Sequence, residues 1–172
     1  MRETSPTDRA WIEAAVDEFE RPLTLYATRL LGNVERGRDV VQDTFLKLWQ
    51  ADRATVEGHL AKWLYTVCRN RALDVRRKEQ RMNAVDGQTM ERETAAPTTP
   101  EPPTATPILA LVDGLPERQQ EAVRLKFQGG LSYREIAEVM NTTANNVGVL
   151  IHTAVKNMRT RLADASPEIA TR

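Results

Sequence analysis

The sequence predicts an all-α protein in which two small helical domains are joined by a flexible, proline-rich linker. In both halves apolar residues recur three or four positions apart, and no segment shows the sustained alternation of a strand. Five of the nine prolines fall in DGQTMERETAAPTTPEPPTATP, which holds too few apolar side chains to offset the entropy of ordering. Aromatic residues make up only 5%, which suits two small cores. The predicted parts are an N-terminal domain (1–85), a linker (86–107), a C-terminal domain (108–163) and a tail (164–172).

Charge is unevenly distributed along a chain whose formal net charge is zero. Residues 1–59 carry 8 basic and 11 acidic side chains, whereas residues 60–81 carry 7 basic and 2 acidic ones. Residues 108–163 are mildly basic, with 7 basic and 5 acidic side chains. An acidic block followed by a short, dense basic segment indicates two surfaces that meet different partners.

Several classes of protein are disfavoured by what the sequence holds. Cys68 is the single cysteine, so an internal disulfide or a cysteine metal cluster cannot form. Two histidines are too few for a ligand set, and we expect no metal and no cofactor. We find no leader pattern and no apolar run of membrane-spanning length. The expectation is a cytoplasmic protein without membrane insertion and without enzymatic activity.

The N-terminal half is predicted to consist of helices. A first apolar pattern begins at Trp11, is interrupted by Pro22 and then continues to a stop at Gly32. A second apolar stripe covers 40–49. A polar loop, Asp52 to Gly58, precedes a long helix over 59–81.

The C-terminal half contains the pattern of a helix-turn-helix. Pro116 opens a helix that ends near Phe127, and Ser132 with Glu135 forms the S-x-x-E capping box of the next helix. Asn141 tolerates the left-handed backbone of the tight turn that follows, and a last helix covers 143–162. In a helix-turn-helix the second helix reads the major groove, whereas an ordinary helical hairpin is the alternative. The residues that would contact DNA are Arg134, Thr143, Asn145, Asn146, Val149, His152 and Lys156.

The long helix of the N-terminal half interleaves basic and aromatic residues in HLAKWLYTVCRNRALDVRRKEQR. Basic side chains can follow a phosphate backbone, and aromatic rings can stack on unpaired bases. The alternative for Trp63 is a place in the core, and Cys68 is expected to be a small buried hydrophobe. The candidate nucleic-acid residues of this helix are Lys62, Trp63, Tyr65, Arg69, Asn70, Arg76 and Arg77.

Read in order, three strings resemble the extracytoplasmic-function (ECF) sigma factors of the sigma-70 family. RDVVQDTFLKLWQ is similar to the helix of that family that binds core RNA polymerase. HLAKWLYTVCRNRALDVRRK is similar to the segments that melt and read the minus-ten promoter element. LPERQQEAVRLKFQGGLSYREIAEVM and the helix after it resemble the domain that reads the minus-thirty-five element.

The resemblance implies a subunit that directs core RNA polymerase to promoter DNA in response to a stress or envelope signal. Its partners would be the β′ clamp helices and the β subunit of the polymerase, promoter DNA and an anti-sigma factor. The loop Asp52 to Gly58 would hold a base flipped out of the minus-ten element. We expect at least one apolar residue of the polymerase-binding set to be core. That set is Asp39, Gln42, Asp43, Phe45, Leu48 and Trp49.

Two other functions are alternatives. A free-standing helix-turn-helix regulator would need a ligand pocket or dimer face in 1–85, and the basic-aromatic helix argues against it. A recombinase would need alternating strands and helices with a nucleophile, which the N-terminal half does not show. The helix over 143–162 is less basic than the family's recognition helix. The resemblance therefore does not define how strongly, or at which sequence, this helix binds the minus-thirty-five element.

Overall fold

The computed structural model describes residues 6–85 and 107–165, and this part of the chain contains helices but no strand. The chain divides into two compact units, Met1–Thr99 and Pro100–Arg172. The predicted all-α class and the helix-turn-helix are confirmed. Most of the predicted linker 86–107 and of the tail 164–172 lies outside the described residues, so the domain boundaries stay predictions.

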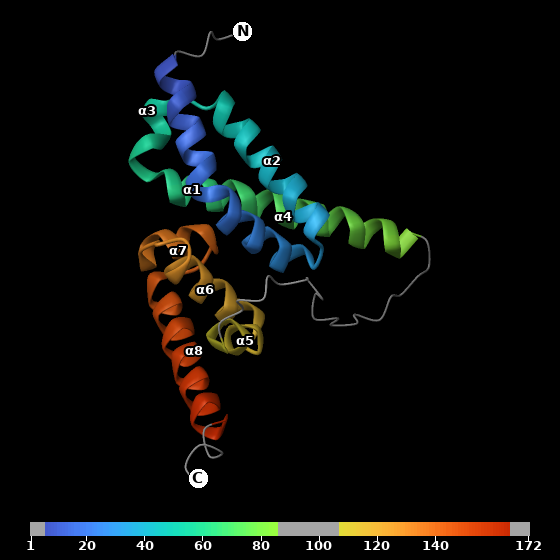
Figure 1. Ribbon diagram of the computed structural model, residues 1–172. Coiled ribbons are helices and arrows are strands. Elements are labelled where there is room, and N and C mark those ends of the chain that lie inside the picture. Colours follow the sequence, from blue (N-terminus) through green and yellow to red (C-terminus); the bar gives the residue numbers. More distant parts are fainter. Residues whose placement is uncertain (1–5, 86–106, 166–172) are drawn as a thin grey trace. The chain divides into compact units, whose positions relative to one another are not determined.

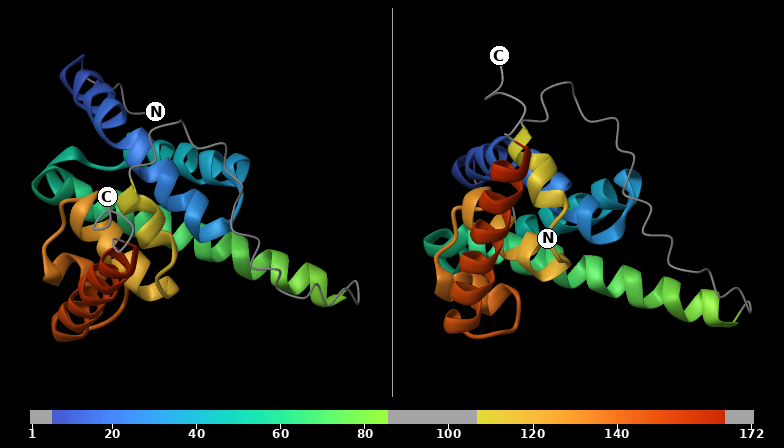
Figure 2. Two further views of the ribbon diagram at one scale, coloured as in Figure 1. Left: turned by 60° about the horizontal axis from the view of Figure 1, so that its bottom comes forward. Right: turned by 90° about the horizontal axis from the view of Figure 1, so that it is seen from below.

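Three long helices form the first unit (Figure 1). They are α1 (Pro6–Leu31), α2 (Val34–Gln50) and α4 (Leu60–Val85). Each packs against the other two. The side of α4 that faces α1 and α2 buries Leu64, Tyr65, Cys68 and Ala72 to 1% exposure or less. The C-terminal half of α4 extends beyond the other two helices (Figure 2), so it has solvent on more of its surface.

The predicted interruption at Pro22 is wrong, because α1 continues through this residue. Proline has no N–H, so the helix loses one i to i−4 hydrogen bond there. The second half of α1 nevertheless stays helical because Leu23, Tyr26 and Ala27 are buried against its neighbours. The predicted stop at Gly32 is confirmed: its φ is 68°, and its N–H donates to the Thr28 carbonyl at 2.7 Å.

The segment predicted as a polar loop, Asp52 to Gly58, contains two short helices. They are α3 (Arg53–Val56) and a 3₁₀ turn, η1 (Glu57–His59). Asp52 caps α3, since its carboxylate accepts from the Ala54 N–H at 3.1 Å. An aspartate at this position can form either a turn or a helix cap. Because the segment has no apolar periodicity, the sequence did not distinguish the two, and the prediction of a loop is wrong.

The second unit contains four helices in the described part of the chain. They are α5 (Pro107–Asp113), α6 (Glu117–Phe127), α7 (Tyr133–Val139) and α8 (Ala144–Ala165), and α8 packs against the other three. Among the residues that fill its core are Leu125, Ile136 and Val147, all fully buried. The Arg124 guanidinium, also buried, pairs with Asp113 at 2.6 Å and so ties α6 to α5.

The helix-turn-helix is formed by α7 and α8. Ser132 and Glu135 form the predicted capping box, with each side chain bonded to the other residue's backbone N–H. Asn141 takes the predicted left-handed conformation, with φ 51°. The Thr143 hydroxyl then accepts from the Asn146 N–H at 3.2 Å and caps α8. Local side-chain chemistry therefore sets both ends of the turn.

The crossing of α1 and α2 depends on a glycine. Gly37 is buried where α2 meets Thr28 of α1. A Cβ at position 37 would lie 2.5 Å from Thr28 Oγ1 and 2.9 Å from the Thr28 backbone nitrogen. No rotamer change removes the second contact, because it involves the backbone.

We predict that Gly37→Ala lowers the unfolding free energy of the first unit by about 1–3 kcal/mol, because the helices must separate to admit the methyl group. Gly58→Ala is the matched control, since a Cβ there meets nothing within 4 Å. Urea unfolding followed by tryptophan fluorescence measures this unit, because Trp11, Trp49 and Trp63 all lie in it. Equal midpoints for the two variants would contradict the close approach.

Candidate partner and nucleic-acid interfaces

The outer face of α2 presents most of the predicted polymerase-binding residues. Asp39, Gln42 and Trp49 are exposed, the last at 49%, and they lie three, seven or ten positions apart, which places them on one side of the helix. Asp43 and Phe45 are half-buried. Leu48 is 1% exposed, so it is the expected core member of the set and has no surface for a partner in this conformation.

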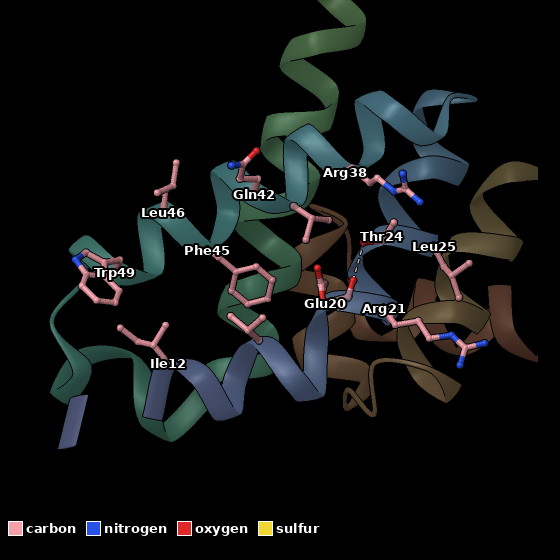
Figure 3. A pocket seen from close by; sticks show the side chains of 12 residues that line it. Ile12, Glu20, Arg21, Thr24, Leu25, Arg38, Gln42, Phe45, Leu46 and Trp49 are labelled. Atoms are coloured by element: carbon pink, nitrogen blue, oxygen red, sulfur yellow. Dashed lines mark hydrogen bonds between the residues drawn. The ribbon is translucent and has the colours of Figure 1, made fainter. Parts of the chain in front are cut away.

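Sequence reasoning missed Leu46, which is 55% exposed between Gln42 and Trp49. The signal was available, because Leu46 lies seven residues after Asp39 and four after Gln42, on the polar side of the helix. Beside this face, α1 and α2 enclose an open groove of about 740 Å³. Figure 3 shows Phe45 pointing into this groove, with Ile12 near Trp49 at one end.

The solvent side of α4 carries six of the seven predicted nucleic-acid residues. At 100° per residue they fall within an arc of about 140°, and one edge of this arc adjoins the buried side of the helix. They form two adjacent stripes of heptad spacing, each ending in an arginine. Asn70 and Arg77 are exposed, and the other four are half-buried. The stripes are Lys62, Arg69, Arg76 and Trp63, Asn70, Arg77.

Tyr65 lies at the edge of the buried side of α4, next to the stripe of Arg69 and Arg76, and is 1% exposed. Its ring meets the Tyr26 ring edge-on, with centroids 5.2 Å apart. Its hydroxyl is buried without a hydrogen-bond partner. In this conformation Tyr65 is therefore a core residue, and no base can stack on it. Its position directly after Leu64 and three before Cys68, on the apolar stripe, was the available signal.

Two ion pairs join α2 to α4. Arg71 Nε lies 2.8 Å from Asp43 Oδ2, and Arg36 Nη1 lies 2.6 Å from Glu79 Oε1. Arg71 is thus turned away from the two basic stripes and toward α2. All four side chains keep between 32% and 49% of their surface exposed, so each pair adds little stability. The pairs instead bring charged side chains of α2 and α4 next to one another.

The exposed side of α8 carries the residues predicted to meet duplex DNA. Asn145, Val149, His152 and Lys156 are all exposed and fall within an arc of about 60°. Asn146 is half-buried, and its Nδ2 donates to Thr142 Oγ1 at 2.8 Å, so this amide is engaged within the turn. The other two predicted residues, Arg134 on α7 and Thr143, are exposed.

The described residues show neither a cluster of side chains suited to a metal ion nor a helix with the length and apolar character that crossing a membrane requires. The burial of Cys68, at 0% exposed, matches its predicted role as a small hydrophobe.

Comparison with known proteins identifies the family of the chain. Family models match twice: sigma-70 region 2 over residues 15–82 and sigma-70 region 4 over residues 106–158. The ECF RNA polymerase sigma factor SigL of Mycobacterium tuberculosis is 32% identical over 165 residues, which cover 91% of this chain and 92% of SigL. The chain belongs to the ECF family of RNA polymerase sigma factors.

Other sigma factors resemble the chain over most of its length. SigW of Bacillus subtilis is 25% identical over 163 residues, or 87% of each chain. The fold is similar to that of the sigma factor RpoE in its complex with the anti-sigma factor NepR from Bartonella quintana. The TM-score is 0.65 at 22% identity, covering 88% of this chain and 96% of RpoE.

Membership of this family assigns the chain to the non-catalytic initiation factors of transcription and disfavours the free-standing regulator. The region 2 match of this sigma factor contains both the outer face of α2 and the two stripes of α4. The region 4 match contains α7 and most of α8. The two candidate DNA surfaces therefore lie in separate family regions of one sigma factor.

The buried Tyr65 gives a prediction about alkaline pH. Burial raises the pKa of Tyr65 to about 12 from an ordinary value of 10.0. Between these values the folded protein keeps a proton that the unfolded chain releases, so stability falls as pH rises through this window and is unaffected below it. We predict that Tyr65→Phe makes the fall between pH 10 and 12 shallower by up to about 1 kcal/mol per pH unit.

At pH 7 the same variant should keep or slightly raise the unfolding free energy, because it removes a buried hydroxyl that has no partner. Urea unfolding at several pH values, read by tryptophan fluorescence, measures both effects. Tyr133→Phe is the control, since Tyr133 is 42% exposed and lies in the other unit. A steeper fall for Tyr65→Phe than for the unmodified protein would contradict this account.

Proposed function

We propose that this sigma factor directs core RNA polymerase to its promoters through three separate surfaces. The outer face of α2 docks on the polymerase, the two stripes of α4 hold the separated minus-ten DNA, and the exposed side of α8 grips the minus-thirty-five duplex. The observation that carries the proposal is the geometry of α4. Burial of its apolar side leaves an arc of basic, amide and aromatic side chains that are exposed or half-buried.

The α2 face suits a partner with basic and apolar surface. It combines the carboxylate of Asp39 and the amide of Gln42 with two exposed apolar side chains, Leu46 and Trp49. Interfaces are centred on desolvated aromatic residues, with charge complementarity setting the orientation. We assign this face to the clamp helices of the β′ subunit, with Leu46 added to the set predicted from the sequence.

The α4 stripes suit a single strand better than a duplex. Lys62, Arg69 and Arg76 follow the helix at heptad spacing, Arg77 lies beside the last of them, and these cations can neutralise phosphates. Trp63, half-buried, offers part of its ring to an unpaired base, and Asn70 has an exposed amide for a base edge. The loop Asp52 to Gly58 lies at the start of this helix, and we propose that it holds the flipped base.

The α8 surface is suited to moderate rather than tight binding of duplex DNA. Lys156 and the neighbouring Arg159 are exposed cations for phosphates, whereas Asn145 and Val149 can meet base edges and thymine methyl groups. The ring nitrogens of His152 can donate or accept a hydrogen bond. With few cations, this unit depends on the rest of the complex for its affinity.

Two weak DNA surfaces in separate units gain affinity when a large partner fixes their spacing. Free sigma factor is therefore proposed to bind promoters poorly, and polymerase-bound sigma factor well. The linker 86–107 would connect the units without forming a domain of its own.

A protein inhibitor and a cytoplasmic location complete the proposal. The similarly folded RpoE was solved in a complex with an anti-sigma factor, and this chain has an open groove and exposed apolar residues on α2 that such a partner could cover. Its release would follow a stress or envelope signal. The chain itself makes and breaks no bond, and it needs no cofactor.

We predict that Asp39→Lys weakens binding to core RNA polymerase about tenfold, because it opposes a basic partner surface. Asp17→Lys, an exposed change of the same charge on α1, is the control. Asp43 is a poorer test, because its reversal also breaks the pair with Arg71. Fluorescence titration of labelled protein with core polymerase gives both affinities, and equal loss in the two variants would remove this face from the model.

We predict that Arg76→Gln with Arg77→Gln reduces the salt dependence of promoter opening. Each lost phosphate contact on single-stranded DNA lowers the slope of log affinity against log salt by about 0.7. The measurement is open-complex formation by the reconstituted holoenzyme at several salt concentrations. Arg118→Gln, an exposed change in the other unit, should leave the slope unchanged. A slope unaffected by the double change would place the DNA elsewhere.

A further inference from the structure

Arg53 joins the loop Asp52 to Gly58 to the first turns of α1. Its Nη1 lies 3.7 Å from Asp8 Oδ1, and its guanidinium carbon lies 5.3 Å from the centroid of the Trp11 ring. On the other side its Nη2 lies 2.7 Å from Glu57 Oε1. One guanidinium therefore meets two carboxylates and an aromatic face at the same time, which its planar shape permits.

The loop has few other attachments. Among residues 52–58, Val56 is buried and Arg53 is half-buried, whereas the other five side chains are exposed. Arg53 also lines an open cavity of about 430 Å³ together with residues of α1 and of the end of α2. Val56 is thus the one buried side chain of the loop, and the Arg53 contacts link the loop to α1.

The contacts join segments that are distant in the sequence. Asp8 and Trp11 are three residues apart and share one side of α1, and Arg53 follows them by more than forty positions. The pairing of Arg53 with Glu57 stays within the loop and can preserve its local shape alone. The contacts with Asp8 and Trp11 fix where the loop lies relative to the domain.

We propose that Arg53, held by Asp8 and Trp11, is the residue that positions this loop for base capture. The proposal rests on the function given above, in which the loop holds the flipped minus-ten base. It makes the first turns of α1 part of promoter recognition through Arg53, without contact with DNA. A loop that loses this support samples more positions, and the pocket for the base is complete for less of the time.

The first test measures the loop in the full-length protein without any partner. Arg53→Gln and Trp11→Leu should each raise amide hydrogen exchange in residues 54–58 roughly fivefold. Arg53→Lys should give a smaller rise, because it keeps the charge and loses the planar fork. Arg9→Gln is the matched control, since Arg9 pairs with Glu13 on its own helix at 3.1 Å. Exchange in α2 and α4 checks that Trp11→Leu keeps its fold.

The second test measures promoter opening by holoenzyme assembled from each variant and core polymerase. With 2-aminopurine in the minus-ten element, Arg53→Gln and Trp11→Leu should slow base unstacking about fivefold while polymerase affinity stays within twofold. Discrimination between the promoter and its single-base variants should weaken at one minus-ten position. The double variant should lose no more than the worse single one, because both changes break the same contact.

The two failures are distinguishable. If the unmodified protein binds polymerase and opens promoters, and the Arg53 and Trp11 variants match it in rate and base discrimination, the positioning role is wrong. Unchanged hydrogen exchange in residues 54–58 also overturns it, whatever the polymerase assays give. If the unmodified protein neither binds polymerase nor opens any promoter, the proposed function fails and the positioning role fails with it.

Discussion

The burial of one side of α4 against α1 and α2 is the constraint on which the first unit depends. Leu64, Cys68 and Ala72 lie on that side and are fully buried, so the rotation of α4 about its axis is fixed. Because the rotation is fixed, the two polar stripes must face solvent. Apolar packing within the core thus decides which side chains of α4 are accessible.

The same packing brings an acidic and a basic surface together. The Asp43–Arg71 and Arg36–Glu79 pairs lie along the seam between α2 and α4. Exposed pairs of this kind stabilise a fold only slightly, so their effect is on the pattern of charge. Arg71 pairs with Asp43 of α2 and lies outside the two α4 stripes, whereas Asp39 is exposed on α2. The surface proposed for polymerase and the surface proposed for DNA are therefore made of different side chains of one small unit.

Sequence reasoning succeeded where local chemistry decides the structure, and failed where long-range packing does. The capping box of Ser132 and the left-handed turn at Asn141 were predictable, because a few adjacent residues determine each. The continuation of α1 through Pro22 was not, because burial of the following helix half against α2 and α4 outweighs the lost hydrogen bond. The aromatic side chain of Tyr65 suggests base stacking, but its position on the apolar stripe places it in the core.

The sequence by itself determined the all-α class, the helix-turn-helix, the uneven charge and the resemblance to ECF sigma factors, because periodicity, caps and motif order are local or linear properties. Tertiary structure decided which members of each candidate set are accessible: it buried Leu48 and Tyr65, exposed Leu46 and engaged Arg71 with Asp43. It alone brought Arg53 to Asp8 and Trp11. The exposure and the ion pairing of a side chain depend on which other helices pack against it, and the order of residues along one helix does not specify this.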